Sequence, residues 1–435
     1  MRVIELNGPI TQELVRRNLP RAAVSVEDAL QVVLPLIADV RDRSLAAIKE
    51  HAMRFDGVDS ASVKVSSSQL KAALDSIDPQ LRAAIEISIA RVQKVSAAAV
   101  PKDFTVDLAP GARVRQRYVP VDSVGLYVPG GKAVYPSSVV MNAVAAQTAG
   151  VSRLAIASPG QKNFDGLPHP AILATAALLG VDEVYAIGGA SAVAAFAYGI
   201  PEIGLEPVRM VTGPGNIYVA AAKRALRGKI GIDSEAGPTE ILILADETAN
   251  PAAVAADLIS QAEHDENAAA VLVSTSSELI EAVLLELKQQ VPTTANRQRV
   301  EAALQGEQSA LVLCSNLDDA IAISNEYATE HLEIHTKDNE AVLSRITNAG
   351  AVFMGEYSPV SLGDYLAGSN HVLPTSEQAK FGPGLGVHSF LRPQQIIDYS
   401  LQGLEDLVES LETFAHAEGL SAHSDAAKIR FTRGN

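Results

Sequence analysis

The sequence predicts an α/β protein with two parallel sheets and additional segments at both ends. Three observations support this class. From about residue 125, short β-branched runs alternate with alanine-rich segments of helical pattern. The same alternation starts again at residue 241, and amphipathic helical stretches lie before and after it. Strands that alternate with helices at this spacing form parallel sheets with helices on both faces.

Two helical stretches are predicted ahead of the alternation, after a separate short arm at residues 1–24. Residues 25–54 carry apolar side chains at helical spacing, so a helix is expected there with Ser25 as its N-cap. Pro35 lies inside this helix and should kink or split it. The second helical stretch is expected at residues 68–99.

The alternation itself predicts two α/β units. The first run predicts strands at 154–158, 184–187 and 208–211, with helices at 171–179, 192–198 and 217–226. The second run predicts strands at 241–244, 270–274, 310–314, 332–334 and 351–354, with helices at 251–263, 279–288, 317–330 and 341–346. Residues 393–430 again have apolar side chains at helical spacing, which predicts a terminal helical arm.

The composition excludes several classes of protein. Hydrophobic residues make up 47% of the 435 residues and charged residues 20%, so the chain has enough apolar surface to fold. A formal charge of −16 and the absence of Trp argue against a nucleic-acid partner. The opening segment has no apolar run behind a basic end, and the long uncharged stretches contain polar or glycine residues. We therefore expect a soluble, cytoplasmic protein without a membrane span.

The cysteine content limits the metal chemistry. Cys314 is the only cysteine, so neither an intramolecular disulfide nor a multi-thiolate metal site can form. Any transition metal must be bound mainly by His, Asp, Glu or Gln. Cys314 itself is expected to be a buried, small apolar residue.

Two glycine-rich loops could hold an anion. Gly213-Pro-Gly-Asn216 follows a predicted strand and opens a predicted helix, where free backbone N–H groups favour a group such as a pyrophosphate. Tyr127-Val-Pro-Gly-Gly-Lys132 is a second loop of this kind. Taken alone, such loops are more often tight strand-to-helix turns.

Two pairs of polar residues lie near the ends of predicted helices. Gln261 and His264 are three residues apart, so they share a helix face and could bind one ion. Glu330 and His331 are adjacent and could divide two proton transfers. Taken alone, the first pair fits a polar helix end and the second fits a solvated charged corner.

A polar, glycine-punctuated loop follows the last predicted strand. Residues 363–375 contain Asp364, Tyr365, Asn370 and His371. Polar loops of this kind on a rigid scaffold carry function more often than packing. Glu418 and His423 add a carboxylate and an imidazole near the end of the sequence.

Together, these segments resemble the histidinol dehydrogenase family. The resemblance runs from Arg54 to His423 and rests on ordered strings: GLYVPGGKAVYPSSVVMNA from Gly125, VTGPGNIYVAAAKR from Val211, AGPTEILILAD from Ala236, DLISQAEHD from Asp257, EHLEI from Glu330 and GDYLAGSNHVLPT from Gly363. It implies zinc-dependent oxidation of L-histidinol to L-histidine through L-histidinaldehyde, with two molecules of NAD, in the last steps of histidine biosynthesis.

The resemblance also implies a role for each matched residue. The zinc ligands would be Gln261, His264, Asp364 and His423. His331 would be the general base that removes the alcohol proton, and Glu330 would activate the water that attacks the aldehyde. The substrate would contact the four ligands and His331, together with Thr239, Tyr365, His371 and Glu418. NAD would contact Tyr127, Ser191 and Asn216.

The family fold implies two incomplete Rossmann-like domains, one inserted in the other. The resemblance divides the chain into an N-terminal arm at 1–24, a first Rossmann-like domain at 25–126 and 241–385 that carries most of the active site, an inserted NAD-binding domain at 127–240, and a C-terminal helical dimerisation arm at 386–435. It also implies a homodimer whose arms complete each other's sites with Glu418 and His423. The residues alone leave open a tail that packs on its own domain.

Three positions depart from the family pattern. Ser191 stands where the family has a Gln near NAD, Val360 replaces the Glu of a common Pro-Glu-Ser, and Thr239 replaces a Ser but keeps the hydroxyl. The first two departures motivate an alternative, a paralogue that oxidises another small primary alcohol, such as a dihydroxypropane sulfonate. A non-catalytic metabolite-binding protein is a third hypothesis, against which the complete set of ligand and catalytic positions argues.

Overall fold

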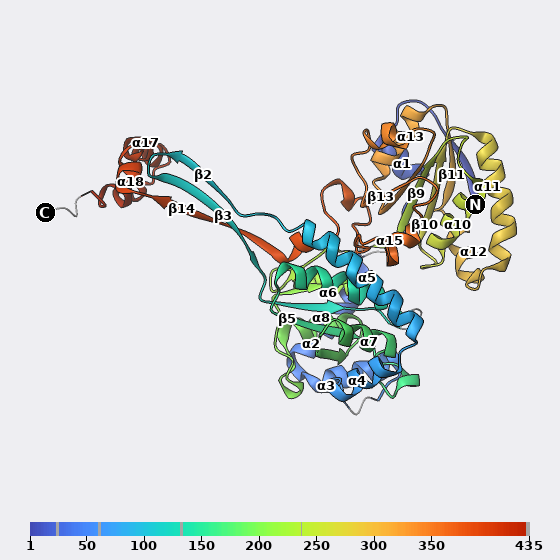
Figure 1. Ribbon diagram of the computed structural model, residues 1–435, viewed down its shortest axis with the longest axis horizontal. Helices are drawn as coiled ribbons and strands as arrows, with labels where there is room; N and C mark the ends of the chain where they lie inside the picture. Colours follow the sequence, from blue (N-terminus) through green and yellow to red (C-terminus); the bar gives the residue numbers. More distant parts are fainter. Residues whose placement is uncertain (23–25, 60–61, 131–133, 236, 432–435) are drawn as a thin grey trace.

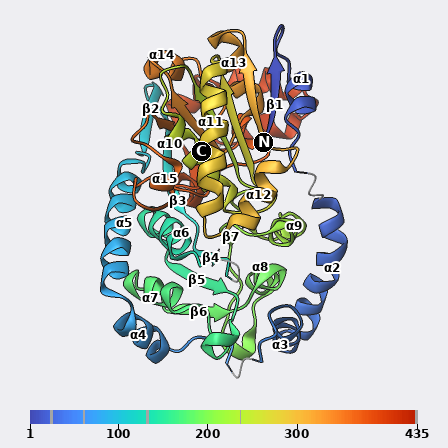
Figure 2. The same ribbon diagram turned by 90° about the vertical axis from the view of Figure 1, so that its right-hand side faces the viewer.

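The computed structural model describes residues 1–22, 26–59, 62–130, 134–235 and 237–431. Two units of sheet and helices lie against each other, and a long arm projects from them (Figure 1). Seen from the side, the helices surround both sheets (Figure 2). No helix in the described part of the chain is long and apolar enough to cross a membrane.

The first unit is built on a six-stranded parallel sheet. In spatial order its strands are β1 (Arg2–Leu6), β11 (Ala310–Cys314), β10 (Ala269–Ser274), β9 (Glu240–Ala245), β12 (His331–His335) and β13 (Ala351–Met354). Its helices are α1 (Gln12–Asn18), α10 (Pro251–Ala262), α11 (Ser277–Gln290), α12 (Arg297–Gln305), α13 (Leu317–Tyr327), α14 (Asn339–Leu343) and α15 (Val360–Tyr365). Alternate residues of β9 belong to two hydrophobic clusters, one on each face, as a parallel sheet covered by helices on both faces requires.

The second unit repeats this plan on a five-stranded parallel sheet. Its strands, in spatial order, are β6 (Glu183–Ala186), β5 (Arg153–Ser158), β4 (Ser123–Tyr127), β7 (Met210–Thr212) and β8 (Gly231–Ile232). Its helices are α6 (Pro136–Ala149), α7 (Pro170–Leu178), α8 (Gly189–Tyr198) and α9 (Ile217–Leu226). The predicted pair of parallel sheets with helices on both faces is confirmed.

Both sheets reverse their strand order at a central strand. In the second unit, β4 lies in the middle, with β5 and β6 on one side and β7 and β8 on the other. In the first unit, β9 has the same central place, with β12 beside it. Such a reversal leaves a crevice at the carboxyl ends of the two central strands, where open α/β sheets bind ligands.

The first hundred residues pack differently from the prediction. Residues 1–24 are not a separate arm, because β1 is the edge strand of the six-stranded sheet and pairs in parallel with β11. Residues 25–126, predicted to share a domain with 241–385, supply four helices to the five-stranded unit instead: α2 (Val26–Arg43), α3 (Leu45–His51), α4 (Ser67–Ser76) and α5 (Pro79–Ala98). The apolar stripe of α2 packs against α8 and α9, which fixes this placement.

The predicted helix breaks are in the wrong places. Pro35 lies inside the continuous helix α2, on its exposed face, where water can satisfy the carbonyl group that proline leaves unpaired. The chain breaks instead at Ser44, whose φ is 51°. The helix expected at 68–99 is two helices, because Asp78 caps α5 and Pro79 occupies its first position. Ser25, the expected N-cap, lies outside the described residues.

The projecting arm is partly a sheet. Its strands are β2 (Phe104–Ala109), β3 (Ala112–Pro120) and β14 (Leu391–Tyr399), and its helices are α16 (Leu401–Glu405), α17 (Val408–Ala417) and α18 (Ser421–Lys428). The expectation of a helix from residue 393 is therefore wrong for the first part of that segment. Residues 391–399 pair with β3 over its whole length, and Pro393 is tolerated because β14 is an edge strand.

Candidate active site

The predicted catalytic residues and three of the four predicted metal ligands meet where the two units touch. Thr239 and Glu240 lie at the amino end of β9, and Glu330 and His331 lie at the amino end of the neighbouring β12. Helix α6, which follows the carboxyl end of β4 in the other unit, reaches this place with Ser138, whose hydroxyl lies 3.2 Å from His371 Nε2. The site thus joins the amino edge of one sheet to the carboxyl edge of the other.

Gln261 presents an unpartnered oxygen to this junction. Its side chain lies on α10 and is 1% exposed. The amide nitrogen donates to the Thr239 hydroxyl at 2.7 Å, while the carbonyl oxygen, Oε1, is buried without a hydrogen-bond partner. A buried carbonyl oxygen without a partner is costly unless a ligand binds it.

His264, three residues after Gln261, faces Asp364. The His264 Nδ1 lies 3.2 Å from the Ser260 carbonyl oxygen, which fixes the proton on Nδ1 and leaves Nε2 with a free lone pair. That Nε2 lies 3.9 Å from Oδ2 of Asp364, on α15. Burial raises the pKa of Asp364, and the neighbouring imidazoles of His264 and His371 act against this rise. His264 and Asp364 are 100 residues apart in the sequence, but their side chains lie close enough to serve as ligands of one metal ion.

Glu330 is held by two hydrogen bonds at the amino end of β9. One oxygen of its carboxylate accepts the Thr239 hydroxyl at 2.5 Å and the Glu240 backbone N–H at 3.1 Å. The side chain is buried, and burial raises the pKa of Glu330 to about 8, although both hydrogen bonds act to lower it. A carboxyl group with such a pKa can exchange a proton near neutral pH.

His331 is held in a neutral form beside this carboxyl. Its Nδ1 lies 3.1 Å from the backbone oxygen of Glu240, so Nδ1 carries the proton and Nε2 can accept one. Burial lowers the pKa of His331 to about 3, and the positive charge of a protonated His264 would lower it further. The imidazole is therefore uncharged at physiological pH.

The rim of the site contains two further predicted residues. His371 is placed by its Nδ1, 2.9 Å from the backbone oxygen of Asp364, and burial lowers its pKa. The Tyr365 side chain is 57% exposed, while its backbone oxygen accepts the Ser88 hydroxyl at 2.6 Å. His371 is thus held beside Asp364, and Tyr365, the last residue of α15, follows Asp364 directly in the chain.

Glu418 and His423 do not join this group within the chain. Glu418 ends α17 and His423 lies in α18, and both side chains are exposed. Figure 1 shows these helices at the far end of the arm, away from α10 and α15. A contribution from them to a site of this kind requires a second copy of the chain.

The glycine-rich loop 213–216 lies at the switch point of the five-stranded sheet. A Cβ on Gly213, whose φ is +114°, would lie 2.0 Å from the backbone oxygen of Tyr127, so only glycine fits. Its N–H donates to Asp233 at 2.8 Å, and its oxygen accepts from Lys223 at 2.5 Å. Lys223 and Asp233 form a buried ion pair, which the sequence reasoning missed.

The three predicted NAD contacts surround this switch point. The Tyr127 hydroxyl, at the end of β4, accepts the Gly189 N–H at 3.1 Å. Asn216 caps α9 by accepting from two backbone N–H groups with its side-chain oxygen. Ser191 is 5% exposed, and its hydroxyl lies 2.8 Å from His51 Nδ1, so α3 already occupies this side chain.

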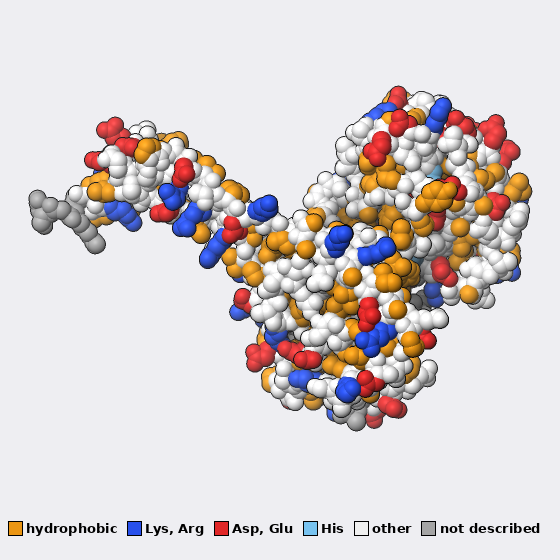
Figure 3. All heavy atoms as spheres, viewed as in Figure 1, with side chains coloured by type: hydrophobic (Ala, Val, Ile, Leu, Met, Phe, Trp, Pro, Cys, Tyr) orange, Lys and Arg blue, Asp and Glu red, His pale blue; other side chains and the backbone are white. Residues whose placement is uncertain are grey.

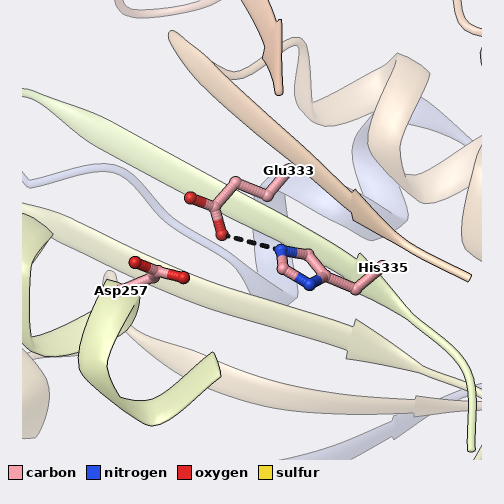
Figure 4. A group of neighbouring side chains, drawn as sticks. All are labelled: Asp257, Glu333 and His335. Atoms are coloured by element: carbon pink, nitrogen blue, oxygen red, sulfur yellow. Dashed lines mark hydrogen bonds and ion pairs between the residues drawn. The ribbon is translucent and has the colours of Figure 1, made fainter. Parts of the chain in front are cut away.

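A second polar cluster lies behind the site. Asp257, Glu333 and His335 are the one group of three His, Cys, Asp or Glu side chains in the described residues that could hold a metal ion (Figure 4). His335 is the last residue of β12. Its partner, Glu333, is two residues away on β12 and on the same face, a signal visible in the string EHLEIH.

The hydrogen bonding separates the two groups of possible ligands. Both oxygens of Glu333 have partners, Val360 N–H at 3.0 Å and His335 Nε2 at 3.2 Å. In the first group, Gln261 Oε1 has no partner and His264 Nε2 lacks a close one. Both groups offer two oxygens and an imidazole nitrogen, which suit zinc. Only the first group has a buried ligand oxygen without a partner, so it fits this metal better than the second.

The switch point of the five-stranded sheet carries a glycine-rich loop of the kind that binds nucleotides. The neighbouring unit supplies possible metal ligands, an imidazole and a carboxyl group. This combination is typical of α/β oxidoreductases. The sequence comparisons specify the family. The family model described as "Histidinol dehydrogenase" matches residues 19–431. The chain belongs to the histidinol dehydrogenase family, which depends on zinc and NAD.

Individual relatives cover nearly the whole chain. A histidinol dehydrogenase of Leifsonia xyli subsp. xyli is 56% identical over 432 residues, which is 99% of each chain. One of Mycobacterium tuberculosis is 52% identical over 434 residues, 99% of this chain and 98% of the other. The crystal structure of histidinol dehydrogenase from Elizabethkingia anophelis has a TM-score of 0.93 at 31% identity, and the match covers 99% of this chain and 98% of that chain.

Proposed function

We propose that the chain oxidises L-histidinol to L-histidine through L-histidinaldehyde, with two molecules of NAD and one zinc ion per site. The observation that carries this proposal is the buried Oε1 of Gln261, which has no hydrogen-bond partner, three residues before the His264 that faces Asp364. Relatives that bear the name histidinol dehydrogenase over their full length support the substrate assignment.

Zinc would be held by Gln261, His264 and Asp364 of one chain and by the partner subunit's His423. Bound there, zinc supplies a fixed Lewis-acid anchor for the nitrogen atoms of the substrate. Thr239, Tyr365 and His371, with the partner subunit's Glu418, would line the rest of the pocket. The hydrogen bond from Gln261 to Thr239 supports this assignment, because it directs the amide oxygen rather than the amide nitrogen toward the ligand.

His331 removes the proton of the substrate alcohol in this proposal. Its Nδ1–H is fixed on the Glu240 backbone oxygen, so Nε2 is the free acceptor. Burial keeps the imidazole neutral, and only the neutral form can accept the proton. Loss of this proton allows a hydride to leave the carbinol carbon for the nicotinamide ring of NAD.

Glu330 acts in the second half of the reaction. One carboxylate oxygen is occupied by the Thr239 hydroxyl and the Glu240 N–H, and the other oxygen is left to accept a proton from water. That water would add to the aldehyde carbon. His331 would then accept a hydroxyl proton of the hydrate, as the second hydride of the reaction leaves its carbon for a second NAD. A pKa of about 8 suits a group that takes up and releases a proton within each cycle.

The five-stranded unit binds NAD in this proposal. Its carboxyl edge faces the catalytic side chains, and the loop 213–216 offers backbone N–H groups at the start of α9. Tyr127, Asn216 and Ser191 would contact the nucleotide. The binding unit then consists of residues 123–232 together with the helices α2–α5 packed on it, and residues 239–385 with β1 form the catalytic unit.

Two copies of the chain form a homodimer through their arms. Along β2, every second side chain is apolar and about half exposed: Phe104, Val106 and Leu108. Phe414 and Leu401 on the arm helices are 73% and 63% exposed, and apolar side chains run along the arm (Figure 3). Apolar surface of this extent on a projecting arm favours burial against another subunit.

The test is the stoichiometry of NADH formation. We expect two NADH per L-histidinol consumed, loss of activity when a chelator removes zinc, and recovery when zinc is restored. The His264→Ala variant is the matched control and should stay inactive after zinc addition. A zinc-loaded protein that leaves L-histidinol untouched but oxidises another small primary alcohol would replace this substrate with that of the paralogue.

A further inference from the structure

The polar cluster behind the site ties three elements together. Asp257 lies on α10, Glu333 on β12, and the backbone N–H of Val360 begins α15. Glu333 is 0% exposed, and it accepts the Val360 N–H with one oxygen and faces His335 with the other. Figure 4 shows the Asp257 carboxyl group directed from its helix toward Glu333. The cluster is therefore a buried junction of one strand and two helices.

Each of these elements also carries a residue of the proposed active site. That residue is four positions from the cluster residue on a helix, or two positions on the strand, so both lie on the same face. On α10, Gln261 follows Asp257 by four residues, and on α15, Asp364 follows Val360 by four residues. Residues four apart share one face of a helix. On β12, His331 and Glu333 are two residues apart and so point to the same face of the sheet.

We propose that Asp257, Glu333 and His335 form a positioning cluster that sets the mutual register of α10, β12 and α15, and thereby brings Gln261, Asp364 and His331 to one point. This inference rests on the proposed function only for the roles of those three residues. A shift of α10 against β12 would move Gln261 and His331 apart, and the cluster prevents it with contacts that bridge both elements.

The buried carboxyl groups of the cluster favour a single relative position of α10, β12 and α15. Two buried carboxyl groups cannot both be charged at low cost, so they share a proton. Burial and the adjacent charge of Glu333 raise the pKa of Asp257 to about 7, so that this side chain can keep the proton. Glu333 then has a partner for each oxygen, and a shift of α15 against β12 would break the bond from the Val360 N–H.

The experiment measures zinc affinity by competition with a chromogenic chelator, in the absence of substrate. We expect Asp257→Ala to weaken zinc binding by about 10–100-fold, the range typical of residues that orient metal ligands. Asp257→Asn should stay within about threefold of wild type, because its amide donates to Glu333 without a shared proton. Should Asp257→Ala fail to fold, Asp257→Leu refills the volume and tests the same loss.

Leu258→Ala is the matched control on the same helix. Leu258 is fully buried in the apolar core, and its truncation should cost about 2–5 kcal/mol of stability without touching the cluster. We expect it to lower the unfolding temperature while zinc affinity stays at the wild-type value. Equal loss of zinc affinity in Leu258→Ala and Asp257→Ala, or no loss in Asp257→Ala and Asp257→Leu, overturns the inference.

The same measurement separates this inference from the proposed function. If Asp257→Ala loses zinc affinity but the wild-type chain does not oxidise L-histidinol, the positioning role stands and the substrate assignment fails. If the wild type oxidises L-histidinol and Asp257→Ala binds zinc normally, the proposed function stands and the positioning role fails.

Discussion

Gln261 donates its side-chain N–H to the hydroxyl of Thr239 at 2.7 Å, and this bond decides which amide atom faces the site. The same hydroxyl donates to Glu330 at 2.5 Å. Thr239 therefore connects the metal side of the site to its proton-transfer side. A hydroxyl at this position is required for both bonds, which the change from Ser to Thr preserves.

Replacement of Thr239 should weaken zinc binding. Thr239→Val keeps the size of the side chain but cannot accept the Gln261 N–H, so the amide is free to turn its nitrogen toward the metal. We expect zinc affinity to fall about tenfold or more in chelator competition, while Thr239→Ser stays close to wild type. Equal affinities for Thr239→Val and Thr239→Ser would contradict the orienting role.

The two catalytic residues should fail at different stages. His331→Asn removes the proton acceptor of both oxidation steps, whereas Glu330→Gln removes only the group that activates water. General bases contribute about 10²–10⁴-fold. We expect His331→Asn to slow both steps by that range, and Glu330→Gln to spare the first hydride transfer in a single-turnover experiment. If Glu330→Gln oxidises L-histidinaldehyde at the wild-type rate, the assigned division of roles is wrong.

The protonated carboxyl of Asp257 should make stability depend on pH. Its pKa is raised from 3.8 in the unfolded chain to about 7 in the folded protein. The folded state then binds the proton more tightly than the unfolded chain. The contribution of protonated Asp257 to the free energy of unfolding is therefore fully present below about pH 4 and is lost as the pH rises toward 7. Relative to Asp257→Asn, wild-type unfolding free energy should fall by at most about 1.4 kcal/mol per pH unit across this window.

Urea denaturation of both proteins between pH 4 and 8 measures this difference. A difference in unfolding free energy that is flat with pH, or that grows as the pH rises, would show that Asp257 is ionised in the folded protein. The shared proton of the positioning cluster would then be excluded.

A carboxylate restored at position 360 should destabilise this chain. The Val360 side chain is 3% exposed and packs in the apolar cluster of the six-stranded sheet. Val360→Glu adds a third carboxyl group beside Glu333, and we expect a loss of about 3 kcal/mol or more. The double variant Val360→Glu, Glu333→Ile should recover part of this loss, because it removes one buried carboxyl group. A double variant less stable than Val360→Glu alone contradicts this account.

Mixing two inactive variants should restore activity if the arms are exchanged between subunits. His264→Ala disables the site of its own chain, and His423→Ala disables the site of its partner. Random exchange of subunits makes half of the dimers mixed, and each mixed dimer has one intact site, so we expect about a quarter of wild-type activity. Activity that stays absent after unfolding and joint refolding of the two variants would place His423 in the site of its own chain.

The local sequence pattern was sufficient to predict those helices and strands whose bounds depend on neighbouring residues in the chain. The helix predicted at 217–226 and the strands predicted at 310–314 and 351–354 have the observed bounds. Capping residues and unbroken apolar runs determine such elements. The strand at 391–399 was missed because its pairing partner, β3, lies more than 270 residues earlier in the chain. Tertiary pairing there overrides an apolar spacing that also fits a helix.

The site was predictable as a set of residues but not as an arrangement. Cys314 is buried, as expected, and 2% exposed. The pairing of Ser191 with His51 could be found only once the elements were placed. The core-facing position of the Val360 side chain likewise depends on how α15 packs against α10.

The place of β1 at the sheet edge has a consequence for synthesis. The strand at residues 2–6 is made about 300 residues before its only strand partner in the described sheet, β11 at residues 310–314. The five-stranded unit, complete by residue 232, can fold long before that partner emerges. Strand β1 therefore has no strand partner until residues 310–314 have been made. Its pairing with β11 is a late step that completes the six-stranded sheet.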